Sequence, residues 1–480
     1  MFPLERIVII NQKSKVAIYK QIAYSIINAI RNGVLKPGIH LPSSRNLAHI
    51  LNVHRKTIIA AYKELEAQEW ITIYPRKYTK VSENIPMLRP QKWNEININP
   101  PYDNDLNVPF RKVRNEVKKD DSFSDIVIDD GHPDVRLSPI NDLLKTYRFL
   151  TSRKYGIKNA HIGTTQGTLN LRKELVQFLS ETRGLNISTD NILVTHGAQM
   201  SIYISAQLLL NNNASIIVGE TNYPVANKTF MEIGAKLIEV NVDNDGIDTY
   251  SIEEICKRER IDAVYVVPHH HYPTTVTLSV DRRMKLLELS KKFSFTVIED
   301  DYDYDFHYSS SPYLPLASAN HSGNVIYIGS FSKLLDPSLR IGFMVAPKNF
   351  IDECTAFRKI IDVGGDGYMQ NALAVLIKEG ELKRHLNKAK KCYHQRRDYL
   401  DDLLKNQLSK CITYSLPSGG MSIWIKLNKE YPISKLQSNN ELKIINVDNK
   451  LNSFRFGFAS MNEQELESAV NILVQLLNKD

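Results

Sequence analysis

Short apolar runs alternate with amphipathic helical segments from about residue 126 onwards, and this alternation restricts the fold more than any other feature. The expected strands are 191–194, 215–218, 235–240, 263–267, 294–298, 324–328 and 342–345. Helices are expected over 168–181, 199–210, 227–232, 251–258 and 281–292. Continuous apolar strands separated by helices are typical of an α/β fold with a mainly parallel central sheet. Such sheets bind ligands at the carboxyl ends of their strands.

Polar loops follow several of these expected strands. The loop 195–199 contains a glycine and opens a helix, so its backbone N–H groups can hold a phosphate, although a simple strand-to-helix turn explains it equally well. In the loop 220–224, Tyr223 can stack on a flat heteroaromatic ring or sit half-buried in the core. Neither loop identifies a site by itself.

Three consecutive carboxylates, Glu299, Asp300 and Asp301, follow the strand at 294–298. Because like charges at a strand end repel one another, we expect a local compensating group. A protonated pyridine nitrogen would supply the compensating positive charge. The alternative is a metal ion, but no histidine ligand pattern accompanies the carboxylates, so no metal is expected.

A lysine, Lys333, lies in the loop 329–342 with Ser330, Ser332 and Arg340. A lysine amine forms a Schiff base with an aldehyde, which makes it a covalent anchor for pyridoxal 5'-phosphate (PLP). Hydroxyls and a permanent cation suit the phosphate ester. A solvated surface lysine is the alternative, but the order of the four loops favours the cofactor.

This ordered set resembles the fold-type I PLP enzymes of the aspartate aminotransferase group. The resemblance implies that Lys333 is the catalytic Schiff-base lysine, that Asp300 pairs with the pyridine nitrogen, and that Tyr302 donates to the phenolic oxygen of the ring. It further implies that Tyr223 stacks on the ring and that Arg455 binds a substrate carboxylate. The residues implied around the phosphate are Gly197, Ala198, Gln199, Ser330 and Arg340. Ala198 replaces a hydroxyl residue common in relatives, so one phosphate contact is missing.

The net charge of +8 is concentrated near the N-terminus. Residues 1–85 contain 13 Lys and Arg against 5 Asp and Glu, whereas the remainder contains 48 of each. Helical periodicity covers about 16–32, 44–51 and 54–69, with Ser43 placed to cap the second helix, and a hairpin follows over 70–81. Two short helices with a tight turn and a basic second helix are typical of a helix-turn-helix that contacts DNA. A basic domain without nucleic-acid function has a similar charge.

Residues 18–70 resemble the winged helix of the GntR regulators. The resemblance implies DNA contacts by Ser44, Arg45, Arg55, Lys56, Thr57 and Lys77. Two departures stand out: His54 occupies a helix cap that is usually serine, and the tip of the wing lacks glycine.

Both halves together resemble the MocR/GabR family of bacterial regulators, in which a GntR winged helix is fused to an aminotransferase-like domain. The expected domains are a winged helix over 1–82, a linker over 83–125, and a PLP-binding domain over 126–480 with a smaller α+β subdomain from about 370. The resemblance implies a homodimer on promoter DNA that senses an amine or amino acid through external aldimine formation at the PLP.

Two alternatives remain open: a working aminotransferase with a DNA-binding appendage, and a scaffold without cofactor. The histidines 269–271 replace a stretch that usually reads Ser-His-Gln. Because alternate side chains of an extended segment point apart, we interpret them as a variant pocket wall and not as a metal site.

The remaining features indicate the compartment. No apolar run reaches the ~18 residues that span a bilayer, and the N-terminus lacks a cleavable signal pattern. The four cysteines are widely spaced, which predicts free thiols in a reducing bacterial cytoplasm.

Overall fold

The computed structural model describes residues 4–12, 14, 16–85, 105–113, 126–161, 165–308, 313–437 and 441–478. Contacts divide the chain into two units, residues 1–110 and 111–480, and each is described by itself. Most of the linker expected over 83–125 lies outside the described residues.

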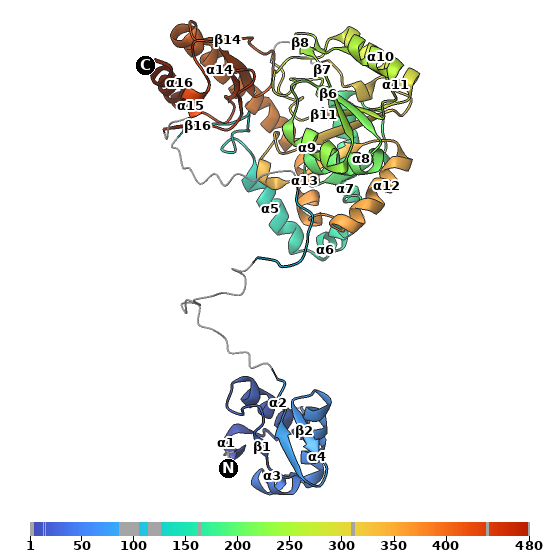
Figure 1. The fold of residues 1–480 in the computed structure, drawn as a ribbon, viewed down its shortest axis with the longest axis vertical. Coiled ribbons are helices and arrows are strands. Elements are labelled where there is room, and N and C mark those ends of the chain that lie inside the picture. Colours follow the sequence, from blue (N-terminus) through green and yellow to red (C-terminus); the bar gives the residue numbers. More distant parts are fainter. Residues whose placement is uncertain are drawn as a thin grey trace. The chain divides into compact units, whose positions relative to one another are not determined.

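The N-terminal unit is the winged helix-turn-helix that the sequence predicted (blue in Figure 1). Its elements are α1 (Leu4–Ile7), α2 (Ile18–Arg31), β1 (His40–Leu41), α3 (Ser44–Ile50), α4 (Arg55–Ala67), β2 (Ile71–Tyr74) and β3 (Tyr78–Val81). The strands form an antiparallel sheet in the order β1-β3-β2. Ile22, Leu47 and Ile58, one from each of the three longer helices, are fully buried in a common core.

Local capping explains where the helices of this unit begin. The hydroxyl of Ser43 accepts the N–H of Asn46 at 3.2 Å and caps α3, as predicted. His54 also works as a cap, because its Nδ1 accepts the N–H of Lys56 at 3.2 Å. At the tip of the wing, Arg76 has φ +61°, so a non-glycine residue occupies the left-handed conformation that usually favours glycine.

The second unit is built on a seven-stranded sheet in the order β5-β13-β12-β11-β10-β6-β7. Its strands are β5 (Ile192–Thr195), β6 (Ser215–Gly219), β7 (Lys236–Val240), β10 (Ala263–Val266), β11 (Thr296–Asp301), β12 (Val325–Ser330) and β13 (Gly342–Val345). β13 runs antiparallel to both neighbours, and the other pairs are parallel. The mainly parallel sheet of the predicted fold class is therefore confirmed.

Helices cover both faces of this sheet (Figure 1). They are α7 (Leu169–Arg183), α8 (Ala198–Leu209), α9 (Pro224–Ile233), α10 (Thr249–Arg258), α11 (Val280–Phe293), α12 (Lys348–Ile361) and α13 (Gly367–Lys378). Two further helices, α5 (Ile140–Thr151) and α6 (Lys154–Ala160), pack against α13. Alternate strand residues enter separate cores: Ile216 packs in the cluster that includes Ile202 of α8, whereas Ile217 packs with Leu286 of α11. Burial on both faces explains why the strands read as continuous apolar runs.

The C-terminal part forms the smaller α+β subdomain (orange to red in Figure 1). Its antiparallel sheet has the order β14-β15-β18-β17. The elements are α14 (Glu381–Leu408), β14 (Ile412–Tyr414), β15 (Ser422–Leu427), α15 (Ser434–Gln437), β16 (Leu442–Ile444), β17 (Val447–Asp448), β18 (Ser453–Gly457) and α16 (Glu463–Asn478). The early strand β4 (Ile126–Ile128) pairs in parallel with β16 and brings residues 129–134 to this subdomain. Across the described residues, no helix combines the length and apolar composition needed to cross a membrane.

Candidate functional site

The loops after the parallel strands surround one cavity of about 250 Å³. It is lined by Asp130, His132, Ala198, Gln199, Tyr223, Tyr265, Val267, Tyr272, Asp300, Tyr302, Ser330, Ser332, Lys333, Pro337 and Arg340. Eight of the ten residues predicted to bind cofactor or substrate are in this set. Gly197 and Arg455 are not, and the structure places each of them beside it.

Lys333 lies three residues after β12, with its side chain 18% exposed. Its Nζ donates to the carbonyl oxygen of Gly131 at 2.8 Å and lies 3.3 Å from Oδ1 of Asp130. The amine therefore lies inside the cavity, held by residues of the segment that follows β4. This position suits a lysine that reacts with an aldehyde.

Asp300 is the only one of the three consecutive carboxylates that lines the cavity. Its Oδ2 accepts the hydroxyl of Tyr265 at 2.6 Å, whereas Oδ1 is buried and has no partner among the described residues. Burial raises the pKa of Asp300 to about 7; the hydrogen bond from Tyr265 opposes this, and the nearby Asp301 and Asp303 add to it. A cationic N–H donor opposite Oδ1 would supply the missing partner, so the site fits a protonated pyridine nitrogen.

Each of the neighbouring carboxylates accepts hydrogen bonds from the protein. Glu299 accepts the backbone N–H groups of Leu316 and Ala317 at 2.8 and 2.9 Å, and Asp301 accepts the hydroxyl of Tyr327 at 2.6 Å. Successive strand residues point to opposite sides, which separates these two from Asp300. Both oxygens of Glu299 are thus hydrogen-bonded, whereas Asp300 and Asp301 each have one buried oxygen without a hydrogen-bond partner among the described residues. His269 Nδ1 lies 3.6 Å from that oxygen of Asp301, and Asp300 is the one that faces the cavity.

The start of α8 and Arg340 meet at one end of the cavity. Gly197 has φ +84°, and a Cβ there would lie 3.0 Å from Nη2 of Arg340, which donates to the carbonyl oxygen of His196 at 3.1 Å. The hydroxyl of Ser332 is buried without a partner among the described residues. A helix N-terminus, a guanidinium and an unused hydroxyl together fit a phosphate group.

The aromatic side chains and Arg455 close the opposite end. Tyr223 is half-buried and packs edge-on against Tyr272, with ring centroids 5.5 Å apart. The hydroxyl of Tyr302 donates to the carbonyl oxygen of His270 at 2.7 Å. Arg455, on β18, lies behind Tyr272, with its guanidinium 4.6 Å from the ring centroid.

The guanidinium of Arg455 is already bonded to the protein. It donates to the carbonyl oxygen of Pro273 at 3.2 Å, to the hydroxyl of Tyr302 at 3.4 Å and to the hydroxyl of Ser422. Its Nε is buried without a partner among the described residues. Arg455 is 1% exposed and does not itself line the cavity.

The interpretation of the three histidines as a pocket wall is wrong. His269 Nε2 lies 2.6 Å from the carbonyl oxygen of Tyr313, His270 Nδ1 lies 2.8 Å from Asp303, and His271 Nδ1 lies 2.9 Å from Thr274. None of them is among the described residues that line the cavity, and His270 has a left-handed backbone (φ +40°). The three imidazoles diverge to separate partners.

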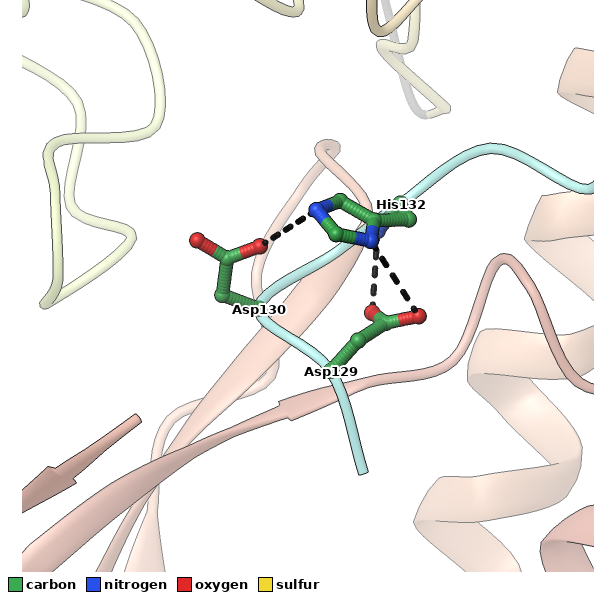
Figure 2. A group of neighbouring side chains, drawn as sticks. All are labelled: Asp129, Asp130 and His132. Carbon is green, nitrogen blue, oxygen red and sulfur yellow. Dashed lines mark hydrogen bonds and ion pairs between the residues drawn. The ribbon is translucent and has the colours of Figure 1, made fainter. Parts of the chain in front are cut away.

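Figure 2 shows a further polar group, Asp129, Asp130 and His132, which could hold a metal ion by distance alone. Asp129 Oδ1 accepts the N–H groups of Gly131 and His132, and Oδ2 accepts the hydroxyl of Ser460 at 2.6 Å. Asp129 therefore fixes the turn that directs Asp130 toward Lys333.

Sequence reasoning missed Tyr265, Asp130 and Tyr272. Tyr265 comes from an expected strand, and only the pairing of β10 with β11 brings it to Asp300. Asp130 directly precedes the Gly-His-Pro-Asp motif at 131–134, and that adjacency was the one available signal.

The predicted DNA-contact residues lie on the N-terminal unit. Arg45, Arg55, Lys56 and Lys77 are exposed, whereas Ser44 and Thr57 are partly buried. Nε of Arg55 donates to the hydroxyl of Ser44 at 3.4 Å, which joins the starts of α3 and α4. Lys77 lies in the turn between β2 and β3, next to Arg76. Long cations at the start of the second helix suit contacts with phosphates and base edges.

Each of the two units matches a known protein family. Residues 151–473 match the family Aminotransferase class I and II, and residues 18–81 match Bacterial regulatory proteins, gntR family. The chain is 26% identical over 432 residues to the HTH-type transcriptional regulator YisV of Bacillus subtilis, covering 88% of this chain and 87% of YisV. It is 26% identical to the probable rhizopine catabolism regulatory protein MocR of Rhizobium meliloti, covering 86% and 83% of the two chains.

Among solved structures, the multiple substrate aminotransferase of Thermococcus profundus has a TM-score of 0.68 and 25% identity, covering 75% of this chain and 92% of that one. An aminotransferase fold thus accounts for the large unit, and the full-length relatives are regulators that span both units. The chain belongs to the MocR/GabR family, GntR-type transcriptional regulators with a domain of the aminotransferase class I and II family.

Proposed function

We propose that this regulator holds PLP at Lys333 and responds to an amino compound that exchanges with the lysine. The observation that carries the proposal is the meeting of Lys333 and Asp300 in one cavity, with a buried carboxylate oxygen of Asp300 that has no partner in the described protein. PLP supplies an aldehyde carbon that exchanges one amine for another, and a ring that withdraws electrons.

The chain's own side chains suit each part of the cofactor. Asp300 would keep the pyridine nitrogen protonated, and Tyr223 would lie against the ring. Tyr302 would exchange its bond to His270 for the phenolic oxygen. The phosphate would lie among Gly197, Ala198, Gln199, Ser330 and Arg340, with Ser332 replacing the hydroxyl that Ala198 lacks.

We propose that the winged helix binds promoter DNA in the bacterial cytoplasm and that two copies act as a dimer on paired half-sites. The candidate contacts are Ser44, Arg45, Arg55, Lys56, Thr57 and Lys77. An effector changes DNA binding only to the extent that it binds two arrangements of the protein with different affinity. An effector that replaces Lys333 on the cofactor changes the contacts of this lysine, which can make its affinity for the two arrangements different.

A working aminotransferase is the second candidate, and the position of Lys333 favours it. Once released, its amine lies beside the carboxylate of Asp130 and can accept and return a proton. Steady turnover of an amino donor with a keto acid would favour this reading. Ligand-dependent DNA footprints without turnover would favour regulation.

The direct test is the absorbance of the purified protein. Wild type should carry the visible band of PLP bound covalently to lysine, and Lys333→Ala should lack it. Lys257→Ala, an exposed lysine on α10, is the matched control and should keep the band. A band that survives in Lys333→Ala, or its absence from PLP-supplemented wild type, would refute the assignment.

A further inference from the structure

Asp130 is an anion placed on the amine side of the cavity. Its Oδ1 lies 3.3 Å from Nζ of Lys333 and 3.2 Å from Nε2 of His132, and its side chain is 22% exposed. Burial alone would raise the pKa of Asp130, but the charges of Lys333, Arg455 and His132 outweigh it and hold the pKa below its usual value. The carboxylate is therefore ionised at neutral pH.

The position of Asp130 is fixed by its neighbours. Asp129 accepts the N–H groups of Gly131 and His132 at 2.7 and 2.9 Å, which tightens the turn seen in Figure 2. The backbone of Asp129 in turn accepts the N–H of Gly457 in β18. These bonds fix the backbone that carries Asp130 beside Lys333.

Cofactor binding alters the charges around Asp130. When Lys333 is bound covalently to the cofactor, it can no longer form a full ion pair with the carboxylate of Asp130. Arg340 lies beside the start of α8, and Arg455 is bonded to Pro273, Tyr302 and Ser422 behind the Tyr272 ring. The other titratable groups near Asp130 on the described chain are His132, which is 43% exposed, and Tyr223, Tyr272 and Tyr302. The carboxylate of Asp130 would then favour a ligand that brings a positive charge close to it.

Resting on the proposed function, we propose that Asp130 selects effectors that carry a second ammonium group, in the class of short diamines and diamino acids. The reacting nitrogen must reach the place of Lys333 Nζ, 3.3 Å from Asp130. Two nitrogens that bond to the same carboxylate oxygen lie at most about 6 Å apart, at ~3 Å for each hydrogen bond. A spacer of about two to four carbons fits this limit. Ligands with a second carboxylate are repelled.

The test uses full-length PLP-loaded protein and matched ligand pairs in isothermal calorimetry, with thermal shift as a second readout. The pairs are 2,4-diaminobutyrate with 2-aminobutyrate, and 1,4-diaminobutane with 1-aminobutane. Wild type should bind the diamino member of at least one pair about 10- to 100-fold more tightly, the range expected for a charge-assisted hydrogen bond. Asp130→Asn should reduce the preference to less than about threefold, and Asp130→Glu should keep its direction.

Equal binding of both members by wild type, or an undiminished preference in Asp130→Asn, would overturn the proposal. The cofactor band is recorded first for every protein. A wild type without the band refutes the proposed function itself, whereas a normal band without ligand preference refutes only the role of Asp130. If Asp130→Asn does not hold PLP, Asp130→Ser takes its place in the comparison.

Discussion

Asp300→Asn should weaken cofactor binding while leaving the cofactor-free protein at least as stable as wild type at pH 8. In the folded protein Asp300 is buried, with one oxygen bonded to Tyr265 and the other without a partner. Asparagine keeps the shape and can accept from Tyr265, but it carries no charge for a protonated pyridine. The lost charge-assisted hydrogen bond is worth about 1.5–3 kcal/mol, or about 10- to 150-fold in PLP affinity.

The predicted effect on the stability of the cofactor-free protein follows from the raised pKa of Asp300. With a pKa of about 7 when folded and about 4 when unfolded, Asp300 holds a proton in the folded state that the unfolded state has released. Wild-type cofactor-free protein therefore loses stability as pH rises from about 4 to about 7, by about 4 kcal/mol at most, and the loss persists above pH 7. An asparagine at position 300 cannot ionise, so the variant does not lose this stability as the pH rises.

The assay is paired: absorbance titration of cofactor-free protein with PLP, and urea unfolding from pH 5 to 8. Glu220→Gln, an exposed carboxylate after β6, is the control and should change neither quantity appreciably. A variant with wild-type PLP affinity would contradict the pairing with the ring nitrogen. A variant that is less stable than wild type at pH 8 would contradict the account of the buried charge.

Three further predictions concern neighbouring groups. Tyr265→Phe removes the one hydrogen bond to Asp300 within the described protein, so the pKa of Asp300 should rise further and PLP affinity should fall about tenfold, measured by the same titration. Gly197→Ala places a Cβ 3.0 Å from Arg340 Nη2 in a left-handed backbone, so affinity for PLP should fall about tenfold more than affinity for phosphate-free pyridoxal; an equal loss for both would argue against a phosphate contact. Arg55→Ala should weaken DNA binding and reduce the slope of log affinity against log salt by about one, and a mobility-shift series at several salt concentrations would contradict the DNA contact if the slope did not change.

The sequence was informative about the strands and about the loops that follow them. In a parallel sheet the carboxyl ends of neighbouring strands meet, so Lys333, Asp300 and Tyr223 could be expected at one edge before any coordinates existed. Helix caps were equally local: Ser43 caps α3 through its own hydroxyl. Both predictions depend on short-range patterns, which a single sequence carries.

Features that depend on long-range pairing were not predictable. Asp130 reaches Lys333 because β4 pairs with β16, more than 300 residues away along the chain. The sequence of β13 does not indicate that this strand is antiparallel, because a strand buried on both faces reads as a continuous apolar run in either direction. For His269–His271 the prediction assumed an extended segment, whereas residues 269 and 270 form a bend and His270 has a left-handed backbone, so the alternation rule did not apply.

We propose that chemistry at Lys333 is coupled to DNA binding. Its most direct test is the affinity of full-length protein for an operator fragment selected in vitro, measured by fluorescence anisotropy with and without an amine that changes the cofactor absorbance. We predict that the amine changes the DNA affinity of wild type by about 5- to 150-fold, the usual range of coupling between sites. Lys333→Ala should bind the same DNA without responding to the amine. An equal response in Lys333→Ala and wild type would contradict the claim.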